Sequence, residues 1–299
     1  MDDFQKLLFE RAAVRGETVT LHEELCRALE HQHLPVAVRR LAGEVTVSAL
    51  LAAGALQFDG SVLLQIAGDG PVKLIVAEVR KDLVFRVSVT MRDDAGEIDP
   101  NASLADLVNR TGRGRCALIL DPTDRAADQQ PYQGVVPLTG GSFAEVMTNY
   151  FIASEQVETK IVLASDEESA GGLMIQKMPI LGGKTLPENF DEDGWQRLQL
   201  FAGTVRSEEL LTLASEDINR RLFWEEAPVV TYETKPVFRC RCSNEAVENM
   251  IRSLGEAEAL DIVKERGKIE ITCHFCGEVR TYDEAAVQAL FAKKNKTLN

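Results

Sequence analysis

The chain of 299 residues carries 47 acidic and 33 basic side chains, which gives a formal net charge of −14 at pH 7. Negative charge on this scale repels a phosphate backbone, so the composition argues against nucleic acid as a partner. The chain is longer than the segment that a single hydrophobic core usually stabilises, which predicts two or more domains. With 45% hydrophobic and 27% charged residues, the chain has the composition of an ordinary folded protein.

The sequence contains no pattern typical of export or of membrane insertion. Its start, MDDFQKLLFERAAVRGETV, has acidic residues where a secretory signal would be basic, and no apolar run approaches the roughly 20 residues that span a bilayer. We therefore expect no membrane partner and a cytoplasmic location. In that compartment thiols stay reduced, and cysteine pairs bind metal or sense redox state more often than they form structural disulfides.

Residues 1–182 are predicted to form an α+β domain with an antiparallel-rich sheet. Three strands are expected at 61–67, 72–79 and 83–91, with the turn sequence GDGP after the first and a strict alternation of side chains in the third. They predict a half-buried antiparallel meander. An amphipathic helix is expected before them, over residues 35–56, because apolar residues recur three or four apart at Leu41, Val45, Ala49, Ala52 and Leu56.

The rest of this domain is expected to mix strands with one more helix. The helix should begin at a Ser142 cap and present Phe143, Met147 and Tyr150 on one face. Apolar runs predict the strands, at 115–120, 159–165 and 171–178.

Residues 183–234 are predicted to form a helical linker. Pro, Gly and acidic residues mark its start in PILGGKTLPENFDEDGW, and ten acidic against four basic residues lie between Glu188 and Glu226. So short a block buries little surface and should be only marginally stable alone. A passive helical spacer is the simpler alternative. Two or three short helices are expected, from apolar residues at helical spacing: Trp195, Leu198, Phe201, Leu211, Ile218, Leu222 and Phe223.

Residues 235–299 are predicted to form a small zinc domain with four cysteine ligands. Cys240 and Cys242 form a C-x-C pair, and beyond the stretch from 243 to 272 Cys273 and Cys276 form a C-x-x-C pair. Four thiolates around one Zn²⁺ give a closed tetrahedral site, and each tight pair presents both sulfurs from one loop. From Val229 onward the chain has 11 basic and 11 acidic residues, and this neutral segment lacks the basic face of a zinc-dependent nucleic-acid binder.

The other candidate ligands and thiols are given lesser roles. His274 lies between the second pair of cysteines and could substitute as a ligand, but with four cysteines available we expect it beside the site or exposed to solvent. Cys26 and Cys116 stand alone in the sequence, and for both we expect a buried apolar thiol.

The residues leave open what the four cysteines do. Many four-cysteine zinc sites are inert, yet Cys240 and Cys242 are close enough to join in a small ring, and C-x-x-C is the arrangement of thiol-disulfide proteins. Oxidation would expel the metal, and a small module that folds largely because of its metal would then loosen. The alternatives are therefore a redox switch, a thiol-disulfide oxidoreductase and a zinc-ribbon-type interaction protein.

Several stretches resemble the redox-regulated holdase chaperones of the heat shock protein 33 family, and the likeness covers nearly the whole chain. The cysteine pairs typical of that family are complete. The matching stretches are RGETVTL, LQFDGSVLLQIAGDGPVKLIV, YQGVVPLTG, YFIASEQVETKI, AGGLMIQKMP, EELLTL, FRCRCSNEAVENMIRSLG and ITCHFCGEVRTYDE.

This resemblance implies both the three-part organisation and a mechanism without catalysis. The four cysteines would bind one Zn²⁺ while reduced, and oxidation would form the disulfides Cys240–Cys242 and Cys273–Cys276. Zinc would leave, the linker would become disordered, and a homodimer formed from reduced monomers would bind unfolding client proteins without ATP. The sequence lacks a G-x-x-x-x-G-K-[ST] phosphate loop, which agrees with ATP independence.

Overall fold

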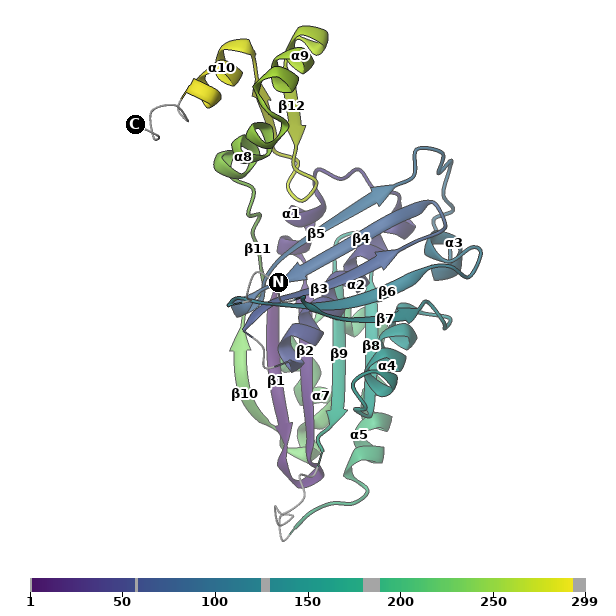
Figure 1. The fold of residues 1–299 in the computed structure, drawn as a ribbon. Coiled ribbons are helices and arrows are strands. Elements are labelled where there is room, and N and C mark those ends of the chain that lie inside the picture. The colour runs from purple at the N-terminus through teal and green to yellow at the C-terminus, as the bar shows by residue number, and fades with distance from the viewer. Residues whose placement is uncertain (1, 57–58, 125–129, 180–188, 293–299) are drawn as a thin grey trace. The chain divides into compact units, whose positions relative to one another are not determined.

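The computed structural model describes residues 2–56, 59–124, 130–179 and 189–292 (Figure 1). Contacts along the chain divide it into two compact units, Met1–Arg239 and Cys240–Asn299. Two hydrophobic clusters lie in the first unit and a third lies in the second. Because the helices between residues 194 and 223 belong to the first unit, a separate linker over 183–234 stays a prediction.

A five-stranded antiparallel sheet forms one layer of the first unit, in the strand order β10-β1-β2-β9-β8. The register places Phe4 opposite Val19 and Leu173 opposite Val162. Successive residues of β2 and β9 are buried, so both faces of these central strands are covered. Its strands are β1 (Asp3–Phe9), β2 (Val14–Leu21), β8 (Thr159–Ser165), β9 (Ala170–Lys177) and β10 (Val229–Thr234). The predicted strands at 159–165 and 171–178 are thereby confirmed.

A six-stranded sheet forms a second layer, in the order β11-β5-β4-β3-β6-β7. The predicted meander is confirmed, because β4 pairs antiparallel with both β3 and β5. The predicted strand at 115–120 is β6, which pairs with β3. The strands are β3 (Gly60–Ala67), β4 (Val72–Val79), β5 (Val84–Met91), β6 (Arg115–Pro122), β7 (Tyr132–Pro137) and the short β11 (Val237–Phe238), which is parallel to β5.

The predicted helix at 35–56 is α2 (Val36–Ala55), and it packs against strands of both sheets. Its small and apolar side chains are buried on nearly every side, as expected for a helix without a solvent face. Beside it α4 (Phe143–Ala153) begins at the predicted cap, where Ser142 Oγ accepts a bond from the Glu145 N–H. The remaining helical turns between these elements are η1 (Glu10–Ala12), α1 (Glu23–Leu29), η2 (Lys81–Leu83) and α3 (Leu104–Val108).

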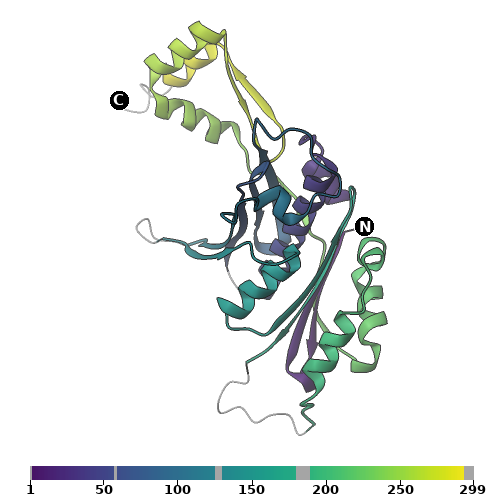
Figure 2. The ribbon, with the colours of Figure 1, turned by 90° about the vertical axis from the view of Figure 1, so that its right-hand side faces the viewer.

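Three short helices cover the other face of the five-stranded sheet, which confirms the helices expected after residue 188. Figure 2 shows them, in green, on the side of the sheet opposite α4. They are α5 (Gly194–Ala202), α6 (Ser207–Thr212) and α7 (Ser215–Phe223), followed by η3 (Trp224–Glu226). Trp195, Leu198, Ile218 and Phe223 are buried against the sheet, while Phe201, Leu211 and Leu222 are partly buried. The expected start of this block, at residue 183, lies outside the described residues.

The described part of the second unit, residues 240–292, consists of three helices and a hairpin. Among these residues the small core contains six that are buried: Ile251, Ala259, Val263, Ile269, Val287 and Leu290. The elements are α8 (Asn244–Leu254), α9 (Glu256–Arg266), β12 (Ile269–Thr272), β13 (Val279–Tyr282) and α10 (Glu284–Ala292). The predicted α+β class, with antiparallel-rich sheets, helices in the middle and cysteines at the C-terminal end, is confirmed.

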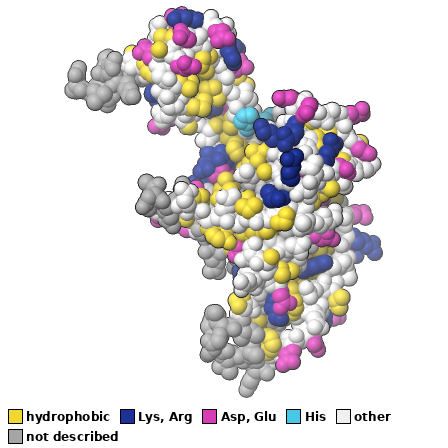
Figure 3. All heavy atoms as spheres, turned by 45° about the vertical axis from the view of Figure 1, so that its right-hand side comes forward, with side chains coloured by type: hydrophobic (Ala, Val, Ile, Leu, Met, Phe, Trp, Pro, Cys, Tyr) yellow, Lys and Arg dark blue, Asp and Glu magenta, His cyan; other side chains and the backbone are white. Residues whose placement is uncertain are grey.

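The surface carries both signs of charge. On the face drawn in Figure 3, acidic and basic side chains are scattered among hydrophobic ones over both units. Among the helices within the described residues, none combines the length and the apolar character that crossing a membrane demands.

Candidate metal centre

The first cysteine pair lies immediately before helix α8. Ser243 caps this helix, since its Oγ accepts a bond of 3.1 Å from the Ala246 N–H. The cap fixes the direction in which the chain enters the helix. Cys242, the residue before the cap, is therefore held at the helix N-terminus. Cys240 lies two positions before it, with its sulfur 3.4 Å from the Cys242 backbone nitrogen.

The second pair occupies the turn between β12 and β13. Two backbone bonds close this turn: the Cys273 N–H donates to the Glu278 carbonyl at 2.9 Å, and the Gly277 N–H donates to the Cys273 carbonyl at 2.8 Å. Gly277 has φ +68°, in the left-handed region that glycine adopts without a steric penalty. The closed turn presents the sulfurs of Cys273 and Cys276 on the same side.

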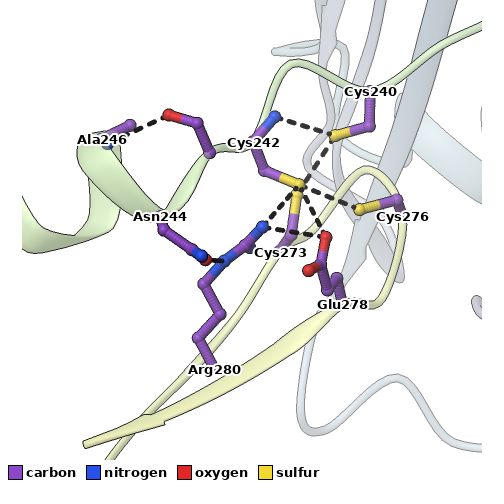
Figure 4. Close-up of polar contacts among 9 residues, drawn as sticks. Cys240, Cys242, Asn244, Ala246, Cys273, Cys276, Glu278 and Arg280 are labelled. Carbon is purple, nitrogen blue, oxygen red and sulfur yellow. Dashed lines mark hydrogen bonds and ion pairs between the residues drawn. The ribbon is translucent and has the colours of Figure 1, made fainter.

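The four sulfurs converge on one point, as Figure 4 shows. They all lie within 4.8 Å of one another, with Cys242 3.3 Å from Cys276 and Cys240 3.5 Å from Cys273. Sulfurs bound tetrahedrally to zinc at about 2.3 Å would be separated by about 3.8 Å. The group thus has the donor type, number and spacing that a closed tetrahedral site requires.

The electrostatics of the group also call for a cation. Burial raises the pKa of the Cys242 and Cys276 thiols. Burial acts in the same direction on Cys240, but hydrogen bonds from the Cys242 backbone and from the neighbouring thiols outweigh it and hold the pKa of Cys240 below its usual value. Packed thiols resist ionising together because like charges repel. A bound metal ion removes that obstacle, since thiolates are the ligand form.

Three polar residues beside the sulfurs were not predicted from the sequence. Arg280, on β13, contacts Cys242 and forms an ion pair with Glu278, and it also donates to Asn244 at the start of α8. Their proximity to the sulfurs depends on the hairpin and the helix being packed together. The spacing of charged residues along the sequence therefore gave no signal for them.

The remaining predicted residues differ in placement. His274 is exposed, and among the described residues the group of possible ligands contains the four cysteines without it. Cys116 is a buried apolar thiol as expected, and burial raises its pKa to about 12. The expectation of a buried apolar thiol at Cys26 is wrong, because this residue is only partly buried. Its thiol lies 3.3 Å from the Glu168 carbonyl, a polar contact that suits the edge of the core.

Known proteins resemble this chain over nearly its full length. The 33 kDa chaperonin of Methylobacillus flagellatus is 40% identical over 97% of this chain and 94% of its own, and that of Pseudomonas fluorescens is 39% identical over the same shares. The crystal structure of the 33 kDa chaperonin of Thermotoga maritima covers 99% of both chains with a TM-score of 0.78 at 21% identity, which shows a shared fold. The model of the Hsp33 protein family matches residues 2–283. The chain therefore belongs to the Hsp33 family, a family of chaperones rather than enzymes.

Proposed function

We propose that this chaperone is a cytoplasmic holdase that is switched on by oxidation of its four-cysteine group and prevents aggregation of unfolding proteins under oxidative stress without ATP. The observation that carries the proposal is the convergence of Cys240, Cys242, Cys273 and Cys276, which the sequence places in two loops far apart along the chain. In the reduced protein these residues would hold one zinc ion. Zinc would neutralise thiolate charge and hold the two loops together.

Oxidation is proposed to join sequence neighbours. Each disulfide forms when two thiolates give two electrons to a peroxide such as H₂O₂, which takes up two protons and leaves as two molecules of water. Two close sulfur contacts, Cys240 to Cys273 at 3.5 Å and Cys242 to Cys276 at 3.3 Å, join the two motifs. Neighbour pairing is nevertheless favoured once the loops separate, because closing a ring within one motif costs less chain entropy than closing a loop from one motif to the other. Cys240–Cys242 and Cys273–Cys276 disulfides would leave no thiolate in the group.

The surface offered to clients is proposed to come from the helices after residue 188. Cys240 comes shortly after β10 and β11 in the sequence. Each of these is an edge strand of one of the two sheets in the first unit, since β10 pairs with β1 and β11 pairs with β5. Unfolding that begins at the cysteines would therefore release the end of this segment. If α5–α7 then detach, the buried side chains of Leu7, Phe9 and Ile175 on the sheet would be exposed, and such apolar surface binds unfolded chains. We propose that the oxidised form is a homodimer and the reduced form a monomer.

The test compares one preparation before and after oxidation. The reduced protein should contain one zinc per chain and leave a heat-unfolded client enzyme to aggregate. After treatment with peroxide at raised temperature it should have lost zinc, protect the client and sediment as a dimer, with Cys240–Cys242 and Cys273–Cys276 found by peptide mapping.

Two variants sharpen this comparison. Cys273→Ser should bind zinc weakly, while Cys26→Ser, which changes a thiol outside the group, should behave as wild type. Reduced wild-type protein without metal, or oxidised protein that protects no client, would contradict the proposal. Efficient reduction of insulin disulfides would instead favour a thiol-disulfide oxidoreductase.

A further inference from the structure

Arg280 is the most enclosed cation beside the cysteine group. Only 11% of its side chain is exposed, although it lies on a two-stranded hairpin in a small unit. Its guanidinium has three partners: Nη2 lies 3.7 Å from Cys242 Sγ and 2.9 Å from the Glu278 carboxylate, and Nε donates to Asn244 Oδ1 at 2.7 Å (Figure 4). The planar fork of arginine allows all three contacts at once.

These contacts connect the two halves of the group. Asn244 is the first residue of α8 and follows Cys242 by two positions, whereas Arg280 follows Cys276 by four positions on β13. The Arg280 side chain therefore bridges the loop of the C-x-C pair and the hairpin of the C-x-x-C pair through protein atoms alone. A bridge of this kind keeps the two loops in register independently of their sulfurs.

The contact with Cys242 also changes the sulfur. A guanidinium N–H that points at a thiolate draws electron density from it, and an enclosed cation is screened by water much less than an exposed one. The Glu278 carboxylate acts in the opposite direction, since its Oε2 lies 3.4 Å from the same sulfur, and Arg280 offsets that negative charge through their ion pair at 2.9 Å. A thiolate with less electron density is a poorer nucleophile toward an oxidant.

We propose that Arg280 is a positioning residue that damps the reactivity of the Cys242 thiolate and so sets how much oxidant the switch requires. The inference rests on the proposed function and adds to it a residue that controls the rate of the oxidation step. In that step a thiolate attacks the O–O bond of peroxide, an S–O bond forms, and hydroxide leaves and takes up a proton. A second thiolate then displaces hydroxide from the sulfenic acid to form the disulfide.

The test uses the full chain with Arg280→Met and Arg280→Lys, and with Arg266→Met as a control that removes the same charge from an exposed position of α9. With peroxide in excess, Arg280→Met should be oxidised about tenfold faster than wild type and bind metal about tenfold more weakly, the range found for residues that support metal ligands. Arg280→Lys should restore slow oxidation, because it keeps the charge. Arg266→Met should match wild type.

A spectroscopic measurement separates damping from a purely structural bridge. With Co²⁺ bound in place of zinc, the thiolate-to-metal charge-transfer band should move to longer wavelength in Arg280→Met, since a more electron-rich sulfur gives up an electron more easily. Weaker binding without a shift of this band would overturn the damping role, as would equal effects of Arg280→Met and Arg266→Met. A wild type that binds cobalt and is oxidised as expected but protects no client would overturn the proposed function alone. A wild type that binds no metal would overturn both.

Discussion

Glu17 is a buried acid at the centre of the first unit. It lies on β2, is only 1% exposed, and has one carboxyl oxygen for which the described residues offer no hydrogen-bond partner. Burial raises its pKa to about 7, although Arg15 and Lys6 act in the opposite direction. A carboxyl group in such surroundings is most stable when protonated.

Stability should therefore fall as pH rises through the range in which Glu17 ionises. Below about pH 4.5 the Glu17 carboxyl is protonated in both the folded and the unfolded chain. The folded state then has its full stability with respect to this group. Between this value and about pH 7 the unfolded chain gives up its proton while the folded chain keeps it, which costs about 3 kcal/mol in total. We expect Glu17→Gln, which cannot ionise, to gain about 2 to 3 kcal/mol over wild type between pH 5 and pH 8 in urea unfolding followed by circular dichroism.

Comparing the two proteins at each pH cancels the other titrating groups they share. Glu208→Gln, at an exposed position of α6, is the matched control and should show no such gain. A difference between Glu17→Gln and wild type that stays constant from pH 5 to pH 8 would show that Glu17 is ionised in the folded protein throughout.

At the same scale, the sequence identified the four cysteines of the group but not the residues beside them. Cys240, Cys242, Cys273 and Cys276 could be predicted because two tight pairs of thiols are a local pattern with few other uses in a reducing compartment. Arg280 could not, because its role depends on the fold that places a β13 side chain against a sulfur at the start of α8. A long side chain on a hairpin can adopt many directions, so the spacing of residues in the sequence does not predict which neighbour it contacts.

Among the elements, the helices α5–α7 combine apolar packing with buried polar contacts. The Asp3 carboxylate accepts bonds from the backbone and hydroxyl of Ser215, and Thr18 Oγ1 lies 2.6 Å from Asn219 Oδ1. Asn219 in turn donates to Gln5 Oε1 at 2.9 Å. When the helices separate from the sheet, polar groups of this kind can form hydrogen bonds with water instead. The interface is therefore more like one between two domains that can separate than like the interior of a hydrophobic core.

Weakening this interface should therefore activate the chaperone without oxidant. Trp195 is nearly buried in the cluster between α5 and the sheet. Truncating a packed aromatic typically costs about 3–5 kcal/mol, which is comparable with the stability of a small subdomain. We expect Trp195→Ala to suppress aggregation of a heat-unfolded client while the protein is still reduced and zinc-bound, whereas wild type should require oxidation first.

Trp224 provides the control, since it is 69% exposed at the end of the same helices. Trp224→Ala should remain inactive when reduced. Circular dichroism should follow the helices in both variants, because the tryptophan left in Trp195→Ala is already exposed and its fluorescence would change little on detachment. Melted helices in Trp195→Ala, with zinc bound and the client still unprotected, would show that exposure of this surface is not what activates the protein.

Which elements could be predicted depends on how their faces are buried. Strand β5 has a regular alternation and was found with its boundary within one residue. No element was predicted for residues 1–34, yet β1, β2 and α1 lie there. The central strands have covered faces on both sides, one toward α2 and one toward α5–α7, and this coverage removes the alternation that marks a strand. Strand β10 pairs with β1, at the opposite end of the first unit's sequence, and no local pattern specifies such a pairing.

For the molecule as a whole, the two units differ in how much core they can supply. The first buries a large cluster between its sheets and another under α5–α7. The second, Cys240–Asn299, has six buried apolar residues within its described part, residues 240–292, and one of them is the small Ala259. A domain of this size is marginal without a further constraint, and a structural metal is a common one.

Removal of metal from the reduced protein should therefore unfold the second unit and leave the two sheets of the first unit folded. The expectation follows from the core sizes, because metal binding in a module with so small a core supplies much of its folding free energy. Hydrogen exchange measured by mass spectrometry, after chelation under reducing conditions, should show lost protection in α8, α9 and the β12–β13 hairpin. Protection in β2 and β9, which lie inside the five-stranded sheet, should persist. If the second unit stays protected once metal loss has been verified by elemental analysis, its core is sufficient alone, and the cysteine group cannot act by controlling whether that unit is folded.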